Sequence, residues 1–170
     1  MGRIFGCGLF LLENLLQMPR VVTVTAQYSQ TPDKVFADAI DLKELVAAMS
    51  DIAVYRGMPS EPLCQAMTIV SDVTFWGWLK IEGHHMHLEN LDLVGRRLQS
   101  REHSKMVKRW DHQITVIPNQ TGAIWIDQVE LDAGWKTYFV ALFCRYMYKH
   151  RHRRRNASQI TTRIHPLRIT

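Results

Sequence analysis

The stretch WKTYFVALFCRYMYKHRHRRR, residues 135–155, decides the fold. Large apolar side chains recur in it three or four residues apart, the spacing of one face of a helix. The stripe consists of Trp135, Tyr138, Phe139, Leu142, Phe143, Tyr146 and Met147. Because burial of each such side chain contributes about 1.5–3 kcal/mol, the pattern predicts a long C-terminal helix that lays this stripe on a sheet. The residues expected on or near the opposite side are Lys136, Thr137, Arg145 and Lys149.

The helix ends in a basic run, KHRHRRR, at residues 149–155. The formal net charge of the chain is +5, and all of it comes from Lys149, Arg151, Arg153, Arg154 and Arg155. The favoured interpretation is that these cations complement the negative end of the helix dipole. The alternatives are a weak contact with an anionic membrane through these five residues, and a protein partner that binds this helix end. A nucleic-acid partner is not predicted, because no aromatic stacking platform accompanies the run.

Upstream of the helix, most of the sequence has the alternating pattern of strands. A β-branched strand at residues 21–28 is followed by Thr31 and Pro32, which predict the N-cap and first residue of a short helix. A second short helix begins at Asp41, where Glu44 resembles a capping box. The strands expected after it lie at residues 52–57, 65–76, 81–91, 97–104, 108–117 and 121–131. Consecutive strands form an antiparallel meander, so the predicted fold class is α+β, with a curved seven-stranded sheet around the long helix.

The two ends of the chain lie outside this pattern. Residues 1–17 are apolar but too few to span a membrane, and are interpreted as an N-terminal extension, flexible or from a misassigned start, with Met18 as the alternative start. Residues 156–170 are polar and aperiodic, which predicts a poorly ordered tail. One domain is therefore expected at residues 18–155. The 3 cysteines lack the spacing of a disulfide framework or zinc knuckle, which favours a cytoplasmic setting.

The order of strand, two short helices, six strands and a long helix resembles the helix-grip fold of the START-related (SRPBCC) superfamily. That superfamily contains lipid-transfer domains, pollen-allergen relatives and polyketide cyclases. The similarity covers residues 20–155, and its local matches are Thr31-Pro32-Asp33-Lys34-Val35-Phe36, Gly57-Met58-Pro59, Trp110-Asp111-His112, Asp127-Gln128-Val129 and the segment from Tyr148 to Arg153. None of these matches is a catalytic signature, so the resemblance supports the fold more strongly than an activity. It implies a cavity between the concave face of the sheet and the last helix.

Strand parity selects the side chains expected to line that cavity. On residues 108–117 the apolar set includes Trp110, His112 and Ile114, and on 121–131 hydrophobicity and the resemblance favour the set of Asp127. Asp72 is either a further polar group in the cavity or a solvent-facing residue. The predicted cavity residues are Thr68, Val70, Asp72, Trp110, His112, Ile114, Trp125, Asp127, Val129, Phe139, Leu142, Phe143 and Tyr146.

Two groups of polar residues are candidates for chemistry. His112 and Asp127 share a face of adjacent strands and can meet across the ladder. The favoured interpretation is a buried pair that satisfies its own hydrogen bonds, and the alternative is a catalytic general acid or base oriented by the carboxylate. His84, His85 and His87 form a second group, but only Glu89 accompanies them, so a metal site is not predicted.

The sequence also lacks the motifs of several enzyme classes. It contains no Walker loop, Rossmann glycine fingerprint or serine elbow, so no nucleotide cofactor or hydrolase chemistry is expected, and no other cofactor is predicted. The exposed pair expected from Trp76 and Trp78, at the turn after residue 75, would form a cavity mouth or a membrane-interface patch unless it packs in the core. The sequence therefore favours a non-catalytic binder or carrier of an apolar or aromatic small molecule or a lipid. The alternative is an enzyme of the polyketide cyclase or aromatase type.

Overall fold

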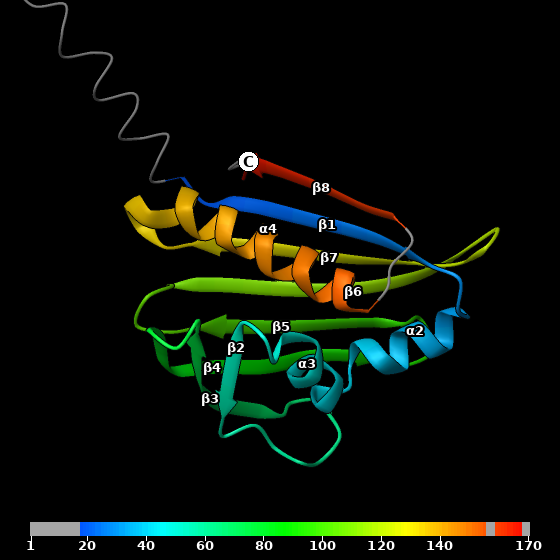
Figure 1. The fold of residues 1–170 in the computed structure, drawn as a ribbon, viewed down its shortest axis with the longest axis horizontal. Helices are drawn as coiled ribbons and strands as arrows, with labels where there is room; N and C mark the ends of the chain where they lie inside the picture. The colour runs from blue at the N-terminus through cyan, green and yellow to red at the C-terminus, as the bar shows by residue number, and fades with distance from the viewer. Residues whose placement is uncertain (1–17, 156–158, 168–170) are drawn as a thin grey trace, which may run out of the picture.

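The fold is a curved antiparallel sheet crossed by one long helix, in a computed structural model that describes residues 18–155 and 159–167. The sheet has eight strands in the order β2-β3-β4-β5-β6-β7-β1-β8. The strands are β1 (Arg20–Tyr28), β2 (Ala53–Arg56), β3 (Thr68–Phe75), β4 (Leu79–Asp92), β5 (Arg97–His103), β6 (Arg109–Asn119), β7 (Gly122–Asp132) and β8 (Gln159–Pro166). The helices are α2 (Pro32–Ala39), α3 (Leu42–Met49), a 3-10 turn at Gly134–Lys136, and α4 (Thr137–Arg154). Figure 1 shows α2, α3 and α4 on the same side of the sheet.

The first two helices begin where the sequence places them. The Thr31 hydroxyl caps α2 by accepting a hydrogen bond from the Lys34 amide at 3.4 Å, and Pro32 occupies the first turn. Asp41 caps α3 through the Lys43 amide at 2.9 Å. The capping-box interpretation of Glu44 is wrong, because its carboxylate pairs instead with Arg151 at 2.8 Å and with Arg155. Glu44 thus joins α3 to the end of α4.

The predicted orientation of α4 about its own axis is wrong, because the large apolar stripe does not face the sheet. The buried face consists of Thr137, Ala141, Cys144, Tyr148, Arg151 and His152. The small side chains of Thr137, Ala141 and Cys144 let the helix approach β1 and β7 closely, which bulky aromatic residues would prevent. Trp135 and Phe139 are 63% and 60% exposed, and Thr137, expected on the opposite side, is fully buried.

The predicted polar tail forms an eighth strand over most of its length. β8 pairs antiparallel with β1 from Gln27↔Gln159 to Arg20↔Pro166, so the expectation of poor order at residues 159–166 is wrong. Ile160 and Ile164 alternate with exposed residues and pack against the core, which is the pattern of an edge strand with one covered face. The predicted extension at residues 1–17 lies outside the described residues. Within the described part of the chain, no helix combines the length and hydrophobicity needed to cross a membrane.

Candidate functional site

A cavity of about 430 Å³ lies between the concave face of the sheet and helices α3 and α4. Its walls are mostly apolar, with contributions from α3, from strands β2 to β6 and from α4. Met49, Val73, Ile81, Phe143 and Met147 are representative wall residues. A concave apolar space of this size with a few polar groups is the usual form of a small-molecule site.

Large residues at the start and along one side of α4 are exposed because they line this cavity instead of packing on the sheet. Trp135, Phe139, Phe143 and Met147 follow one another at intervals of four residues and all contribute to its wall. Trp135 and Phe139, together with the exposed Met106, occupy the end nearest the start of α4. The helix therefore uses small residues against the sheet and large ones around the cavity.

Trp76 and Trp78 form the tip of the β3–β4 hairpin. Trp76 and Gly77 both have positive φ, at 49° and 76°, as in the tight primed turns that follow the twist of a hairpin. Both tryptophans are exposed, at 43% and 72%, and their rings stack at 6.2 Å. Trp76 also touches Phe143 of α4, with ring centroids 5.8 Å apart. The pair is thus exposed beside the cavity wall, as the sequence indicated.

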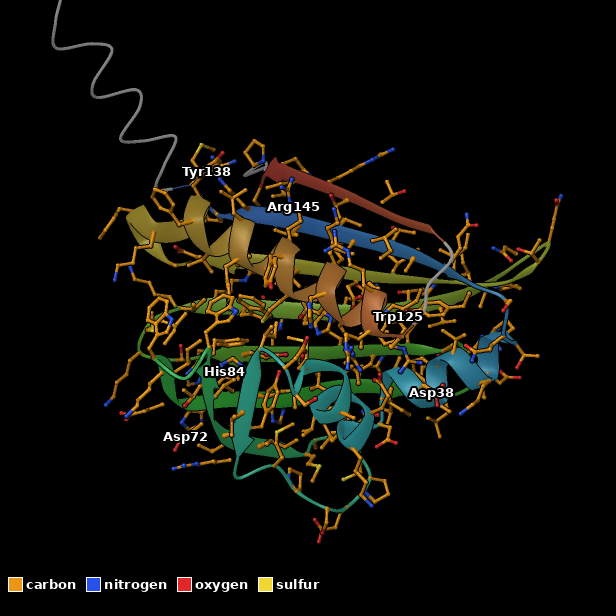
Figure 2. All side chains as sticks on the ribbon, in the orientation of Figure 1. Asp38, Asp72, His84, Trp125, Tyr138 and Arg145 are labelled. Atoms are coloured by element: carbon orange, nitrogen blue, oxygen red, sulfur yellow. The ribbon has the colours of Figure 1, made fainter. Side chains whose placement is uncertain are left out.

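Four of the predicted cavity residues line the cavity: Trp110, His112, Phe139 and Phe143. Ile114, Trp125 and Val129 are buried in the packed core instead. Asp127 is also outside the lining and is hydrogen-bonded to His112. Leu142 and Tyr146 are also outside the lining, and the Tyr146 ring stacks on His150 at 6.0 Å. Trp125 lies beneath the C-terminal end of α4 (Figure 2), where the Arg151 guanidinium covers its ring at 4.7 Å.

The parity predicted for β3 is wrong. Thr68, Val70 and Asp72 are exposed on the outer face, and the inward residues are Ile69, Ser71, Val73 and Phe75. Asp72, labelled at the edge of the molecule in Figure 2, accepts a hydrogen bond from the Gly83 amide at 2.8 Å across a register shift between β3 and β4. Its solvent-facing alternative is therefore the one observed.

The predicted contact between His112 and Asp127 is present within a larger buried network. Asp127 is 1% exposed, and its two carboxylate oxygens accept hydrogen bonds from Nε2 of His112 at 2.9 Å and Nε2 of His152 at 2.8 Å. The Tyr28 hydroxyl lies 2.7 Å from Nδ1 of His152. Burial alone would raise the pKa of Asp127, but the hydrogen bonds from the two imidazoles outweigh it and hold that pKa well below its usual range.

The ionised carboxylate determines the tautomers of both histidines. Since Asp127 can only accept, each Nε2 carries a proton. Nδ1 of a neutral His152 is then the acceptor for the Tyr28 hydroxyl, which completes the hydrogen bonds of that fully buried ring. His112 has no equivalent partner for Nδ1 among the described residues, and it lines the cavity. In the neutral form of His112, the network therefore leaves one ring nitrogen, Nδ1, as an acceptor for a ligand.

A second polar cluster lies across the cavity wall on β4 and β5. Glu102 is 8% exposed and accepts hydrogen bonds from Nε2 of His84 at 2.8 Å and from the Ser100 hydroxyl at 2.6 Å. Ser100 stands directly opposite His112 in the β5–β6 register, so the two clusters are neighbours. Glu102 and His84 both line the cavity, whereas the Glu102 carboxylate was not considered from sequence.

The three histidines of β4 do not converge. His84 points inward to Glu102, while His85 stacks on His103 with ring centroids 4.8 Å apart. His87 lies 2.9 Å from the Thr68 hydroxyl on the exposed face, and Glu89 pairs with Arg101. Among the described residues, no group of three or more potential ligands could hold a metal ion.

Two arginines of the basic run form ion pairs with residues of α2 and α3. Arg151 is 4% exposed, and its Nη2 donates to Glu44 at 2.8 Å and to the Ala39 carbonyl at 3.1 Å. Arg155 pairs with Glu44 and with Asp38. Arg151 and Arg155 are therefore not available for a membrane contact. Lys149, Arg153 and Arg154 keep accessible side chains, so contact with a membrane or a protein partner through them stays a prediction. Arg151 and Arg155 lock α4 onto α2 and α3.

Two tyrosines complete the polar part of the cavity. Burial raises the pKa of Tyr55 to about 12, and burial raises that of Tyr148 as well, so both phenols stay neutral at ordinary pH. Tyr148 lies against His112, with ring centroids 4.9 Å apart. The Tyr55 hydroxyl has no side-chain partner within the described residues, and Tyr55 belongs to the cavity wall.

A curved antiparallel sheet with one long helix across its concave face and a cavity between them defines the helix-grip fold, as the sequence predicted. Protein CV1439 from Chromobacterium violaceum shares it with a TM-score of 0.62 and 11% identity, over 79% of this chain and 92% of that one. A START superfamily protein from Mycobacterium smegmatis matches with a TM-score of 0.59 and 8% identity, over 79% and 93%. CalU16 from Micromonospora echinospora matches with a TM-score of 0.57 and 10% identity, over 80% and 76%.

The chain belongs to the family described as Domain of unknown function (DUF8410), whose model matches residues 43–158. This range contains the cavity-lining strands and the whole of α4, but not β1 with Tyr28. No curated protein sequence matches the chain.

Proposed function

We propose that this protein binds or carries an apolar or aromatic small molecule, or a lipid, in the cavity between the sheet and α4. The observation that supports this most directly is the cavity of about 430 Å³, whose walls are mostly apolar with a few polar groups. Such a space gives affinity through burial of apolar surface, and its few polar groups orient the ligand. The exposed Trp135 and Phe139 at one end provide an apolar entrance.

Two measurements test this proposal. The protein is purified gently, and its organic extract is analysed by mass spectrometry for a co-purified compound. Thermal unfolding is then followed with a panel of lipids and aromatic compounds, since a ligand at one hundred times its Kd stabilises the folded state by about 2.7 kcal/mol. We expect at least one class of apolar ligand to raise the Tm. An empty extract together with an unchanged Tm across the panel would contradict a binding cavity.

A second candidate, an enzyme of the polyketide cyclase or aromatase type, is favoured by one specific feature. Nδ1 of His112 lines the cavity while Asp127 fixes Nε2, which is the arrangement of a histidine oriented for proton transfer. A cavity that holds a polyketide-like chain could use this base to abstract a proton during cyclisation. Replacement of His112 by Ala should then abolish turnover of a candidate substrate, and unchanged turnover would remove the catalytic assignment.

A further inference from the structure

Most polar side chains of the cavity lie in one region, whereas Ser104, which follows β5, and Lys136, from the 3-10 turn before α4, contribute to the wall separately. Tyr55, Ser71, Glu102, His112 and Arg151 come from β2, β3, β5, β6 and α4, and all line the cavity. Ser71, Glu102, His112 and Arg151 are each less than a tenth exposed. Tyr55 stands opposite Val73 in the β2–β3 register, and Val73 is two residues from Ser71 on the same face of β3. Ser71 in turn stands opposite His84, which donates a hydrogen bond to Glu102. A polar group on the ligand can therefore be bound by several side chains in this region.

The charges of this region disfavour an anionic ligand. Arg151 is already paired with Glu44, which it shares with Arg155. Glu102 and Asp127, in contrast, receive their hydrogen bonds from imidazole and hydroxyl groups, and no lysine or arginine of the described residues pairs with either carboxylate. A carboxylate placed beside Glu102 would meet a like charge in a desolvated space, where repulsion is poorly screened.

The hydrogen-bonding groups of His112 and Tyr55 are complementary to a hydroxyl group, and the Nε–H of Arg151, unpaired among the described residues, is a further donor in the same region. Nδ1 of a neutral His112 is a lone-pair acceptor, because the single ring proton is on Nε2, where Asp127 accepts it. The Tyr55 hydroxyl is a neutral donor with no side-chain partner among the described residues. A ligand hydroxyl can donate to the first kind of group and accept from the second, whereas a ketone can only accept.

We propose that the ligand carries a neutral hydroxyl group, phenolic or alcoholic, on an apolar body, and that the region of Tyr55, Glu102 and His112 selects this group over a carboxylate. This inference rests on the proposed binding function and names the ligand class. The hydroxyl donates to Nδ1 of His112 and accepts from Tyr55, while the apolar body lies along Phe139, Phe143 and the facing strands.

The test uses three probes that share one ring system: 2-naphthol, naphthalene and 2-naphthoate, titrated calorimetrically into the full chain near neutral pH. A neutral hydrogen bond changes affinity by about three- to tenfold, so 2-naphthol should bind tighter than naphthalene by about that factor. 2-Naphthoate should bind at least about tenfold more weakly than 2-naphthol, because of its charge. A carboxylate that binds as tightly as the phenol, or a phenol that binds no better than the hydrocarbon, overturns the inference.

Two variants tie the preference to the named atoms. Tyr55→Phe removes only the hydroxyl, and His112→Gln keeps an amide donor for Asp127 while moving the acceptor, now the Gln carbonyl oxygen, away from the position of Nδ1. Each should bring the affinity ratio of 2-naphthol to naphthalene down about threefold or more, with naphthalene affinity unchanged. Tyr138→Phe is the matched control, since Tyr138 lies outside the cavity lining, and should leave the ratio as in the wild type.

The outcomes separate the two proposals. If all three probes bind but the ratio stays the same in both variants, the hydroxyl assignment is overturned and the binding function stands. If none of the probes binds and no extract contains a ligand, the binding function fails and the inference fails with it. Should Tyr55→Phe lower the Tm by itself, the probe series in the wild type and His112→Gln still decide the result.

Discussion

Replacement of Asp127 by Asn tests the buried hydrogen-bond network that holds His112 in the cavity wall. The carboxylate is 1% exposed and accepts hydrogen bonds from His112 and His152. The Asn amide keeps one acceptor oxygen but presents an N–H group to the other imidazole N–H. The loss of one charge-assisted bond, with a donor left unpaired, should destabilise the fold by about 2–4 kcal/mol.

Thermal and urea denaturation measure this effect, and about 2–4 °C per kcal/mol is expected for a chain of this length. Asp33→Asn is the matched control, because the Asp33 side chain is 83% exposed and its pair with Arg96 contributes less than about 1 kcal/mol. A loss in Asp127→Asn no larger than in this control would refute the assigned network.

The effect should also depend on pH, with a sign that follows from the lowered pKa of Asp127. The unfolded carboxyl takes up a proton near its ordinary pKa of about 3.9, whereas the folded one resists protonation. Its stabilisation is therefore fully present above about pH 5 and is lost as the pH falls toward the folded pKa. The stability difference between wild type and Asp127→Asn should narrow below about pH 4, and a constant difference would contradict the charge assignment.

Two further predictions concern the helix end and the cavity wall. Arg151→Met keeps the apolar stem but removes the bonds to α2 and α3, so urea denaturation should show a loss of about 2–4 kcal/mol, against less than about 0.5 kcal/mol for the exposed Arg153→Met. Val73→Phe should fill part of the cavity and weaken ligand binding, measured as a smaller ligand-induced rise in Tm, whereas Val70→Phe on the outer face of the same strand should leave it unchanged. Equal effects within either pair would contradict the corresponding placement.

The strands were largely predictable, since alternation and turn residues are local signals. The strand expected at residues 97–104 is observed at Arg97–His103, and the one expected at 121–131 at Gly122–Asp132. β8 was missed because Gln159–Pro166 carries only two isoleucines among polar residues, and its stability comes from pairing with β1. An edge strand needs little hydrophobicity of its own when a neighbouring strand supplies the hydrogen bonds.

The rotation of α4 could not be read from hydrophobicity alone. The largest apolar residues suggested the sheet-facing side, but the sheet requires small residues such as Ala141 and Cys144, and the cavity accepts the large ones. The small residues at positions 137, 141 and 144 were the available signal. The burial of His152 could not be predicted, because it lies in a run of arginines and its partners Asp127 and Tyr28 are distant in sequence.

The candidate site was therefore predictable only where strand parity was clear. His112 and Asp127 meet as expected from the alternation on β6, and from hydrophobicity and the family resemblance on β7. Glu102 was not predicted, since a carboxylate on an inward face contradicts the usual burial preference unless partners such as His84 and Ser100 are known. Buried polar groups that depend on tertiary partners are the part of a site that one sequence reveals least.

A crystal structure of the protein grown with 2-naphthol tests the central claim most directly. We predict ring density between Phe143 and the inner face of the sheet, with the hydroxyl oxygen within hydrogen-bonding distance of Nδ1 of His112. A cavity closed by its own side chains at saturating ligand, or a ligand bound only elsewhere on the molecule, would contradict it.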